Sequence, residues 1–209
     1  AIEKMPIDYF GYYSLLVPFV DGYFRMDEVE KARDLSGKIA VKYSDRLSYF
    51  NSLEANLQYA MGEEIITEIE RYRTLIEASL KHAEKNELSP ILNTFLDSIE
   101  PFKYLYGDYE FYTGLVDVVE GYYLEDTLES AQSLSKKIGE QYSNRIQLFS
   151  QISEENQRQL LTRIQDELSE YNYFVQLVKS YDSTSFGNEI EADFNKNLNV
   201  FAPLLSEEE

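Results

Sequence analysis

Residues 16–50 read LVPFVDGYFRMDEVEKARDLSGKIAVKYSDRLSYF, and residues 115–149, ninety-nine positions later, read LVDVVEGYYLEDTLESAQSLSKKIGEQYSNRIQLF. Sixteen of the thirty-five aligned positions are identical, and Gly22 and Gly121 are one such pair. A long internal repeat with helical periodicity predicts stacked helical units, because each unit leaves an apolar face that only a neighbour can cover. We therefore predict an all-α superhelical array made of two units of about 99 residues.

The repeat also sets the expected domain organisation. We expect one helical-repeat domain over residues 1–209, with repeat one at about 9–105 and repeat two at about 108–205. A chain of this length can bury a substantial core. Most of its 18 tyrosines and 12 phenylalanines fall at helical intervals beside leucine, isoleucine and valine, which predicts core and interface positions.

Charge restricts the partners that the chain can bind. It carries 38 acidic and 19 basic side chains, a formal charge of −19, and no lysine- and arginine-rich stretch that could neutralise a run of phosphates. Nucleic acid is therefore not an expected partner. The same charge disfavours docking on an anionic lipid surface. We expect protein or peptide partners.

Cysteine is absent, which excludes disulfides, thiolate nucleophiles and cysteine metal ligands. The longest apolar stretch, residues 15–20, is far shorter than a membrane-spanning helix and contains Pro18. We expect no direct membrane insertion by these residues. The chain opens without methionine or an apolar leader, which suggests a fragment from which a signal peptide or more of a parent protein has been removed.

The helical stripes predict where the first helices lie. We expect a first helix from near Asp8, bent at Pro18, and a straighter counterpart in the second copy, where Asp117 replaces the proline. Asp27, followed by Glu30, predicts the N-cap of the second helix as a capping-box variant, and residues 126–129 repeat it. A long third helix should follow.

The third helix is expected at residues 52–85, where apolar residues keep a helical stripe. Ser89 followed by proline predicts an N-cap and the first helical position of a fourth helix, which Glu100-Pro101 should end or bend. In the second copy we expect an inserted polar loop at residues 181–188, after which residues 198–201 echo residues 92–95.

Polar candidates for a site have stronger structural interpretations. His82 has no second histidine and no cysteine to act with, so we expect a solvated helix residue and neither a metal site nor a catalytic base. Acidic pairs could in principle supply an acid and a base, but in so acidic a chain a solvated face is the expected explanation. These pairs are Glu63/Glu64, Glu154/Glu155, Glu207/Glu208, Glu64/Glu68 and Glu167/Glu170.

Two duplicated motifs complete the candidates. For the triplets that begin at Gly22 and Gly121 we favour packing, with a small residue where helices cross closely and an aromatic ring filling the gap. The motifs Tyr43-Ser44-Asp45-Arg46 and Tyr142-Ser143-Asn144-Arg145 suit either a recurrent surface contact or an arginine bound to a neighbouring helix end. We assign no catalytic, cofactor-binding or metal-binding residue, and no binding residue is identified.

The segment from Leu16-Val17 to Tyr43 resembles a tetratricopeptide unit. It carries Gly22-Tyr23-Phe24, Asp27, Glu30-Lys31-Ala32, Leu35 and Lys38-Ile39. The resemblance implies a tetratricopeptide-like superhelical array. Asp27 and Asp126 stand where that family usually has a turn glycine, and the long third helix is extra.

A second resemblance is carried by three motifs. They are Met5-Pro6-Ile7-Asp8-Tyr9-Phe10, Val20-Asp21-Gly22-Tyr23-Phe24 and Tyr43-Ser44-Asp45-Arg46-Leu47-Ser48-Tyr49-Phe50. They are similar to the soluble C-terminal regions of bacterial multi-pass membrane proteins related to protein O-mannosyltransferases. The resemblance implies that transfer chemistry lies in an absent membrane domain, while these residues form an extracytoplasmic (periplasmic) scaffold tethered to a membrane.

These observations predict a noncatalytic helical-repeat scaffold that mediates protein interactions. The alternative is a free-standing secreted or lipid-anchored all-α protein that binds a peptide or glycan. We expect no cofactor. The divergent loop at residues 181–188 and the polar faces are the expected places for anything specific.

Overall fold

A computed structural model describes residues 13–82, 84 and 87–205. The described residues are almost entirely helical and contain no β-strand, so the predicted all-α class is confirmed. Among these residues no helix combines the length and the apolar character that crossing a bilayer requires. The chain divides into two compact units, which are described separately below.

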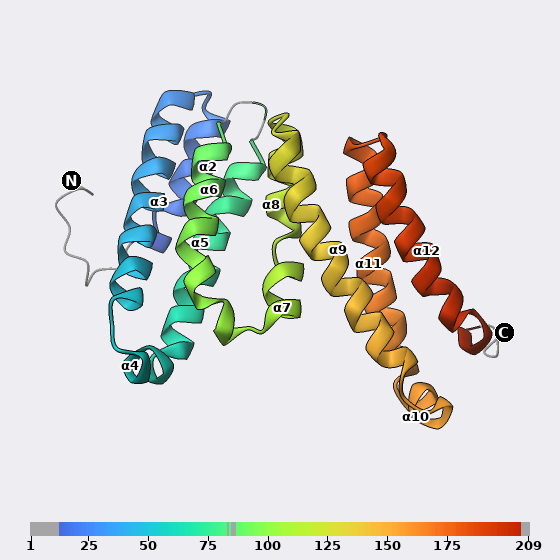
Figure 1. Ribbon diagram of the computed structural model, residues 1–209. Helices are drawn as coiled ribbons and strands as arrows, with labels where there is room; N and C mark the ends of the chain where they lie inside the picture. The colour runs from blue at the N-terminus through green and yellow to red at the C-terminus, as the bar shows by residue number, and fades with distance from the viewer. Residues whose placement is uncertain (1–12, 83, 85–86, 206–209) are drawn as a thin grey trace. The chain divides into compact units, whose positions relative to one another are not determined.

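The first unit comprises Ala1–Gly107 and Leu124–Thr127. Its helices are α2 (Val17–Arg25), α3 (Val29–Asn51), α4 (Ala55–Ala60), α5 (Gly62–Leu80), α6 (Ser89–Ile99) and the 3₁₀ helix η3 (Glu100–Leu105). The helix α3 packs against α2, α5 and α6 (Figure 1). The core of this unit therefore surrounds α3.

The second unit comprises Asp108–Tyr123 and Leu128–Glu209. Its helices are α7 (Asp108–Thr113), α8 (Val116–Leu124, whose last residue belongs to the first unit), α9 (Leu128–Ser150), α10 (Glu154–Gln159), α11 (Leu161–Tyr181) and α12 (Ser185–Leu205). Here α9 packs against α7, α11 and α12. The bounds of α2, α3 and α4 recur ninety-nine positions later as those of α8, α9 and α10.

Aromatic contacts at the centre of each unit recur with the same offset. Tyr43 stacks on Tyr72 with ring centroids 5.2 Å apart, and Phe95 meets Tyr72 edge-on at 5.0 Å. In the second unit Tyr142 stacks on Tyr171 at 5.0 Å, and Tyr171 meets its own edge-on partner, Phe194, at 5.2 Å. Offset stacks and edge-to-face contacts are the favoured geometries of aromatic pairs and add to the energy of burial.

The expectation of a straighter first helix in the second copy is wrong. In the first unit the helix breaks at a turn before Val17, where the amide of Leu16 donates to the carbonyl of Tyr13 at 2.9 Å. The second unit has the same turn without proline, because the amide of Leu115 donates to the carbonyl of Tyr112 at 2.9 Å. Proline is therefore not required for the break. The predicted start near Asp8 lies outside the described residues.

The prediction that Asp27 is an N-cap is also wrong. Asp27 has φ 62° and Asp126 has φ 55°, so both adopt the left-handed conformation. The amide of Glu28 donates to Tyr23 and that of Asp27 to Phe24, which is the Schellman pattern that closes a helix C-terminus. Asp27 therefore ends α2 and does not begin α3. It fills the position where the tetratricopeptide pattern has glycine.

The predicted third helix over residues 52–85 is interrupted. It consists of α4 and α5, which are separated at Met61, and α5 ends at Leu80. The side chain of Gln58 on α4 donates to the carbonyls of Asn51 and Leu53, at 3.0 and 2.8 Å. Gln157 does the same in the second unit. These amides satisfy carbonyls that the end of the preceding helix leaves without partners.

The fourth helix is present, but the prediction that Ser89 is its N-cap is wrong, because α6 already begins at Ser89 and Leu88 occupies the N-cap position. The cap comes from a distant residue. The Glu125 carboxylate accepts the backbone amides of Leu88 and Ser89, the latter at 2.5 Å. Pro101 then lacks the N–H that continued α-helix needs, and the chain changes from α6 to the 3₁₀ helix η3. The predicted bend at Glu100-Pro101 is confirmed.

The predicted inserted loop at residues 181–188 is wrong. Only residues 182–184 separate α11 from α12, and α12 is continuous to Leu205. The offset of ninety-nine persists, because Ser98 donates to Ser44 at 2.9 Å and Asn197 donates to Ser143 at 3.0 Å. Phe95 therefore corresponds to Phe194, and the expected echo of residues 92–95 in residues 198–201 has the wrong register.

Candidate functional site

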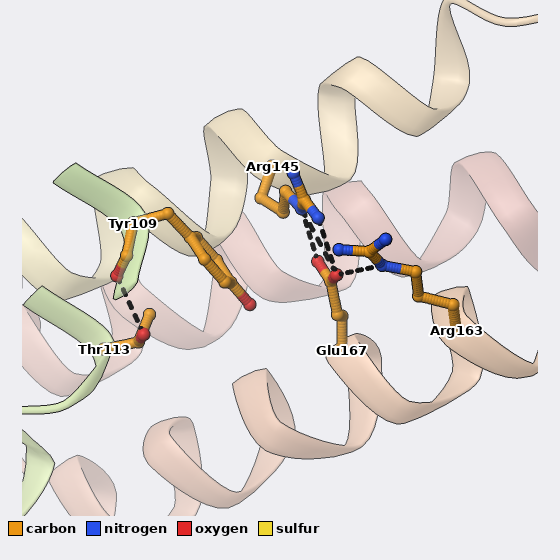
Figure 2. A network of polar contacts seen from close by, with 5 residues as sticks. All are labelled: Tyr109, Thr113, Arg145, Arg163 and Glu167. Atoms are coloured by element: carbon orange, nitrogen blue, oxygen red, sulfur yellow. Dashed lines mark hydrogen bonds and ion pairs between the residues drawn. The ribbon is translucent and has the colours of Figure 1, made fainter. Parts of the chain in front are cut away.

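The duplicated arginine motif forms a partly buried ion-pair network in the second unit. Arg145 on α9 holds the carboxylate of Glu167 on α11 in a forked contact at 3.0 and 3.2 Å (Figure 2). Arg163, one turn earlier on α11, reaches the same carboxylate at 3.1 Å. The Tyr109 ring lies beside the network, 5.2 Å from the Arg145 guanidinium carbon. The motif therefore joins α9 to α11 through a side-chain carboxylate inside α11, and not through a helix end as the structural interpretation predicted.

The first unit pairs its charges differently. Arg46 contacts Glu64 at 2.5 Å, and the buried Glu68 is held by Arg71 at 2.6 Å. The residues ninety-nine positions after Glu64 and Arg71 are Arg163 and Glu170, so both charges are reversed. Arg163 binds the buried carboxylate of the second unit, Glu167, as Arg71 binds Glu68 in the first unit. Glu170, at the position of Arg71, forms no salt bridge with a described residue.

The expected solvated acidic face is therefore only partly present. Glu68 and Glu167 are buried, with 2% and 8% of their surface exposed, whereas Glu63, Glu154 and Glu155 are exposed. Burial raises the pKa of Glu68, and the Arg71 charge and hydrogen bond only partly oppose the rise. The pair Glu207/Glu208 lies outside the described residues.

An open hollow of about 610 Å³ lies in the second unit, between α7, α8 and α11. Its acidic members come from three helices, with Glu110 on α7, Asp117 on α8 and Glu170 on α11. Tyr173, which is 61% exposed, adds an aromatic surface. The remaining lining residues are Thr113, Gly114, Val116, Tyr142 and Ser169. No lysine or arginine lines the hollow, so its charge is uniformly negative.

Tyr142 gives the hollow a polar group at its base. Only 4% of Tyr142 is exposed, yet the residue lines the hollow. Its hydroxyl forms no hydrogen bond within the part of the chain that the structure describes. Burial raises the pKa of Tyr142, and the nearby Glu170 and Glu167 carboxylates raise it further. The hydroxyl is therefore protonated at neutral pH and can both donate and accept a hydrogen bond.

The three carboxylates of the hollow form no salt bridge, although Glu110 lies close enough to Arg145 to add to the rise that Glu167 causes in the pKa of that guanidinium. Glu110, Asp117 and Glu170 form no salt bridge with any described residue. No group of three or more histidine, cysteine, aspartate or glutamate side chains that could hold a metal ion occurs in the described ranges.

His82 does not have the solvated environment that we expected. Its ring stacks on Phe24 with centroids 4.7 Å apart, and Nε2 lies 2.7 Å from Asp21 Oδ1. This hydrogen bond is the main reason that the pKa of Asp21 is lowered, and Arg25, 2.7 Å from the same carboxylate, contributes. The ring makes a tertiary contact between the end of α5 and α2.

The same arrangement recurs in the second unit with different residues. Tyr181 stacks on Tyr123 at 5.5 Å, and its hydroxyl donates to Glu120 at 3.2 Å. Each unit therefore has a pair of stacked rings at the corresponding position. None of these ring residues lines the hollow.

The glycine of the first duplicated triplet is not a close-packing residue. A Cβ added at Gly22 would meet nothing within 4 Å, so the expected helix crossing is absent there. Phe24 is buried, and Tyr122 and Tyr123 are also buried, as the packing interpretation of the aromatic residues requires.

Sequence reasoning missed the hollow because it emphasised residues that recur. Asp117 replaces Pro18, Glu170 replaces Arg71 and Tyr173 replaces Thr74. A comparison of charge between the two copies could have found two of these positions. It could not have shown that residues fifty positions apart face one space. Comparisons of the chain with protein-family models, with curated proteins and with solved structures gave no match.

Proposed function

We propose that this chain is a noncatalytic helical-repeat scaffold whose second unit binds a partner polypeptide in the acidic hollow. The observation that carries the proposal is the hollow itself, with three carboxylates that form no salt bridge with a described residue and the buried Tyr142 in its lining. Concave sites with a few convergent polar groups are the usual form of a binding site.

The recurring polar residues support this assignment indirectly. Arg145, Ser143 and Gln157 each bind atoms of a neighbouring helix or helix end, as their counterparts do in the first unit. Such residues serve the structure of each unit. The residues of the hollow that differ between the copies are the ones left to contact another molecule.

Blocking the hollow with a bulky side chain tests this proposal. A displayed library of random twelve-residue peptides is selected on the protein, and the affinities of the selected peptides are then measured by fluorescence anisotropy. Ser169→Trp places an indole in the hollow and should weaken binding by roughly tenfold or more. Ser133→Trp, at an exposed position on α9 of the same unit, is the matched control and should change affinity less than about twofold.

The two tryptophan variants distinguish binding in the hollow from binding elsewhere. Circular dichroism and thermal melts establish that both tryptophan variants are folded. Selection of no peptide above background would reject the proposed function. Selected peptides whose affinity is equal in both variants would place binding elsewhere.

We also propose that the two units form a tetratricopeptide-like array belonging to an extracytoplasmic scaffold of a membrane-bound glycosyltransferase-like protein. The recurring helix bounds support the array. The motif resemblance supports the membrane-bound parent protein and the extracytoplasmic location. A phosphatase reporter fused after Leu205 in the natural gene product tests the location. Activity of the reporter is expected only outside the cytoplasm, so an inactive reporter would contradict the location.

A further inference from the structure

We infer that the hollow of the second unit receives a lysine or arginine side chain of its partner polypeptide. This inference rests on the proposed function and specifies the chemistry of the partner.

The first unit carries its own cation at the corresponding position. Arg71 is held by the buried Glu68, at 2.6 Å, and its charge acts on the hydroxyl of Tyr43, whose pKa it lowers against a larger rise caused by burial. Ninety-nine positions later, these three residues are Glu170, Glu167 and Tyr142. The second unit thus keeps the buried carboxylate and the tyrosine but replaces the arginine with a further acid.

That replacement leaves the second unit without a cation beside Tyr142. Arg145 and Arg163 are both committed to Glu167, which takes three of its hydrogen bonds from Arg145 and one from Arg163. Glu170 has no salt-bridge partner among the described residues. An incoming ammonium or guanidinium group would supply the positive charge that Arg71 supplies in the first unit.

The opposite wall increases the preference for a cation. Glu110 and Asp117 add two carboxylates where the first copy has Gly11 and Pro18. Tyr173 offers an exposed aromatic face, and a cation within about 6 Å of such a face gains electrostatic stabilisation. Charge-assisted hydrogen bonds to carboxylates are stronger than neutral ones. The Tyr142 hydroxyl can accept a further hydrogen bond from the same cation.

Peptides that differ only in charge test the inference. The probes are an eight-residue peptide of alternating lysine and glycine, the corresponding arginine and citrulline peptides, spermidine, and Mg²⁺. Binding is measured by titration calorimetry at 50 and 150 mM NaCl. We expect the lysine and arginine peptides to bind, with lower affinity at higher salt, and the uncharged citrulline peptide to bind at least about tenfold more weakly.

Matched variants separate the hollow from the overall negative charge. Glu170→Arg installs the residue that the first unit folds with at this position, and it should weaken binding of the lysine peptide by roughly tenfold. Glu155→Arg makes the same change of charge at an exposed position of α10 and should have less than about a twofold effect. Tyr142→Phe should weaken binding roughly threefold, whereas Tyr43→Phe, which removes the corresponding hydroxyl, should leave affinity unchanged.

Several results would overturn the inference. Equal effects of Glu170→Arg and Glu155→Arg would show that only the net charge attracts the peptide. Equal binding of the citrulline peptide would remove the requirement for a cation, and spermidine binding as tightly with the same dependence on Glu170 would identify a free polyamine. Displacement of the peptide by micromolar Mg²⁺ would indicate a metal site. If Ser169→Trp weakens the binding of library peptides that contain no lysine or arginine, the proposed function stands and this inference fails.

Discussion

At the scale of single residues, the turns between the first helices depend on aspartates in an unfavourable conformation. Asp27 and Asp126 both have positive φ, which L-residues other than asparagine and aspartate rarely adopt. The sequence shows the aspartate but not its conformation, since an acidic residue before a helix also fits an N-cap. The backbone hydrogen bonds that Glu28 and Asp27 donate to the last turn of α2 show that Asp27 ends that helix and is not the N-cap of α3.

This conformation predicts an unusual order of stabilities at Asp27. The variant Asp27→Gly should be more stable than Asp27→Ala by about 1 kcal/mol in urea unfolding, because glycine has no Cβ to strain a positive φ. The matched control is Gly37 in the middle of α3, where a Cβ would meet nothing within 4 Å. There, Gly37→Ala should stabilise by about 0.5–1 kcal/mol. Alanine favoured at both positions would contradict the role of Asp27 in closing α2.

The two buried glutamates predict opposite responses to neutralisation. At pH 7, Glu68→Gln should stabilise the protein or leave it unchanged, because burial disfavours the charge of Glu68 and raises its pKa. Glu167→Gln should destabilise it by about 2–4 kcal/mol, because Arg145 and Arg163 both lose their shared partner. Thermal melts and urea unfolding of both variants measure the difference.

The effect of Glu68 should also depend on pH. A folded-state pKa above the unfolded value favours the folded protein at low pH, and this contribution is lost as the pH rises from the unfolded pKa through the folded one. Any advantage of Glu68→Gln should therefore be present at pH 7 and disappear as the pH is lowered towards 4.5, the ordinary pKa of a glutamate side chain. An advantage that grows on acidification would contradict the raised pKa.

At the scale of elements, the sequence predicts helix type and order well and helix interruptions poorly. The apolar stripes identify the helical class, and Ser89 and Pro101 mark the beginning and end of α6. The break at Met61 is hidden, because the apolar stripe continues across it. Gln58 and Gln157, which bind the preceding helix ends, have no local sequence signature for that role.

The candidate site is harder to predict for a related reason. Glu110 and Glu170 belong to helices far apart in the chain, and only the packing of α7 and α11 around α9 brings them to one hollow. The sequence itself contains no information on the distance between them. Charge reversal between the copies, as at Arg71 and Glu170, is the signal that the sequence does contain.

The short connection between α11 and α12 yields a prediction about Gly187. A Cβ at this position would collide with the backbone carbonyl oxygen of Asp182. Asp182 is buried, and its side-chain carboxylate accepts hydrogen bonds from Thr184 and Gln132, which hold the residue in place. Gly187→Ala should therefore destabilise the protein by about 2–4 kcal/mol, because backbone must shift to admit the methyl group. Urea unfolding measures the change, and a variant as stable as Gly37→Ala would refute the close approach.

At the scale of the whole molecule, negative charge opposes folding. The formal charge of −19 places like charges throughout a chain of 209 residues, and compaction brings them closer together. Most of the ion pairs, such as Arg158 with Glu154, lie at the surface, where each contributes little. Repulsion between unpaired carboxylates should therefore exceed these local attractions.

This balance predicts a stabilising effect of salt. Raising NaCl from 20 to 300 mM at pH 7 should increase stability by about 1 kcal/mol, or roughly 2–4 °C in Tm, because screening weakens long-range repulsion. Calorimetric melts measure the shift. The same series at pH 4.5, where many carboxylates are protonated, should show a smaller effect. A Tm that falls with salt at pH 7 would mean that ion pairs dominate.

The stacking of His82 on Phe24 has a practical consequence. Because the chain contains one histidine, its imidazole protons give isolated resonances in a proton spectrum. The ring current of Phe24, whose centroid is 4.7 Å from that of His82, should move these resonances away from their random-coil positions. One signal thus reports whether the end of α5 is docked on α2, without isotope labelling or an added probe.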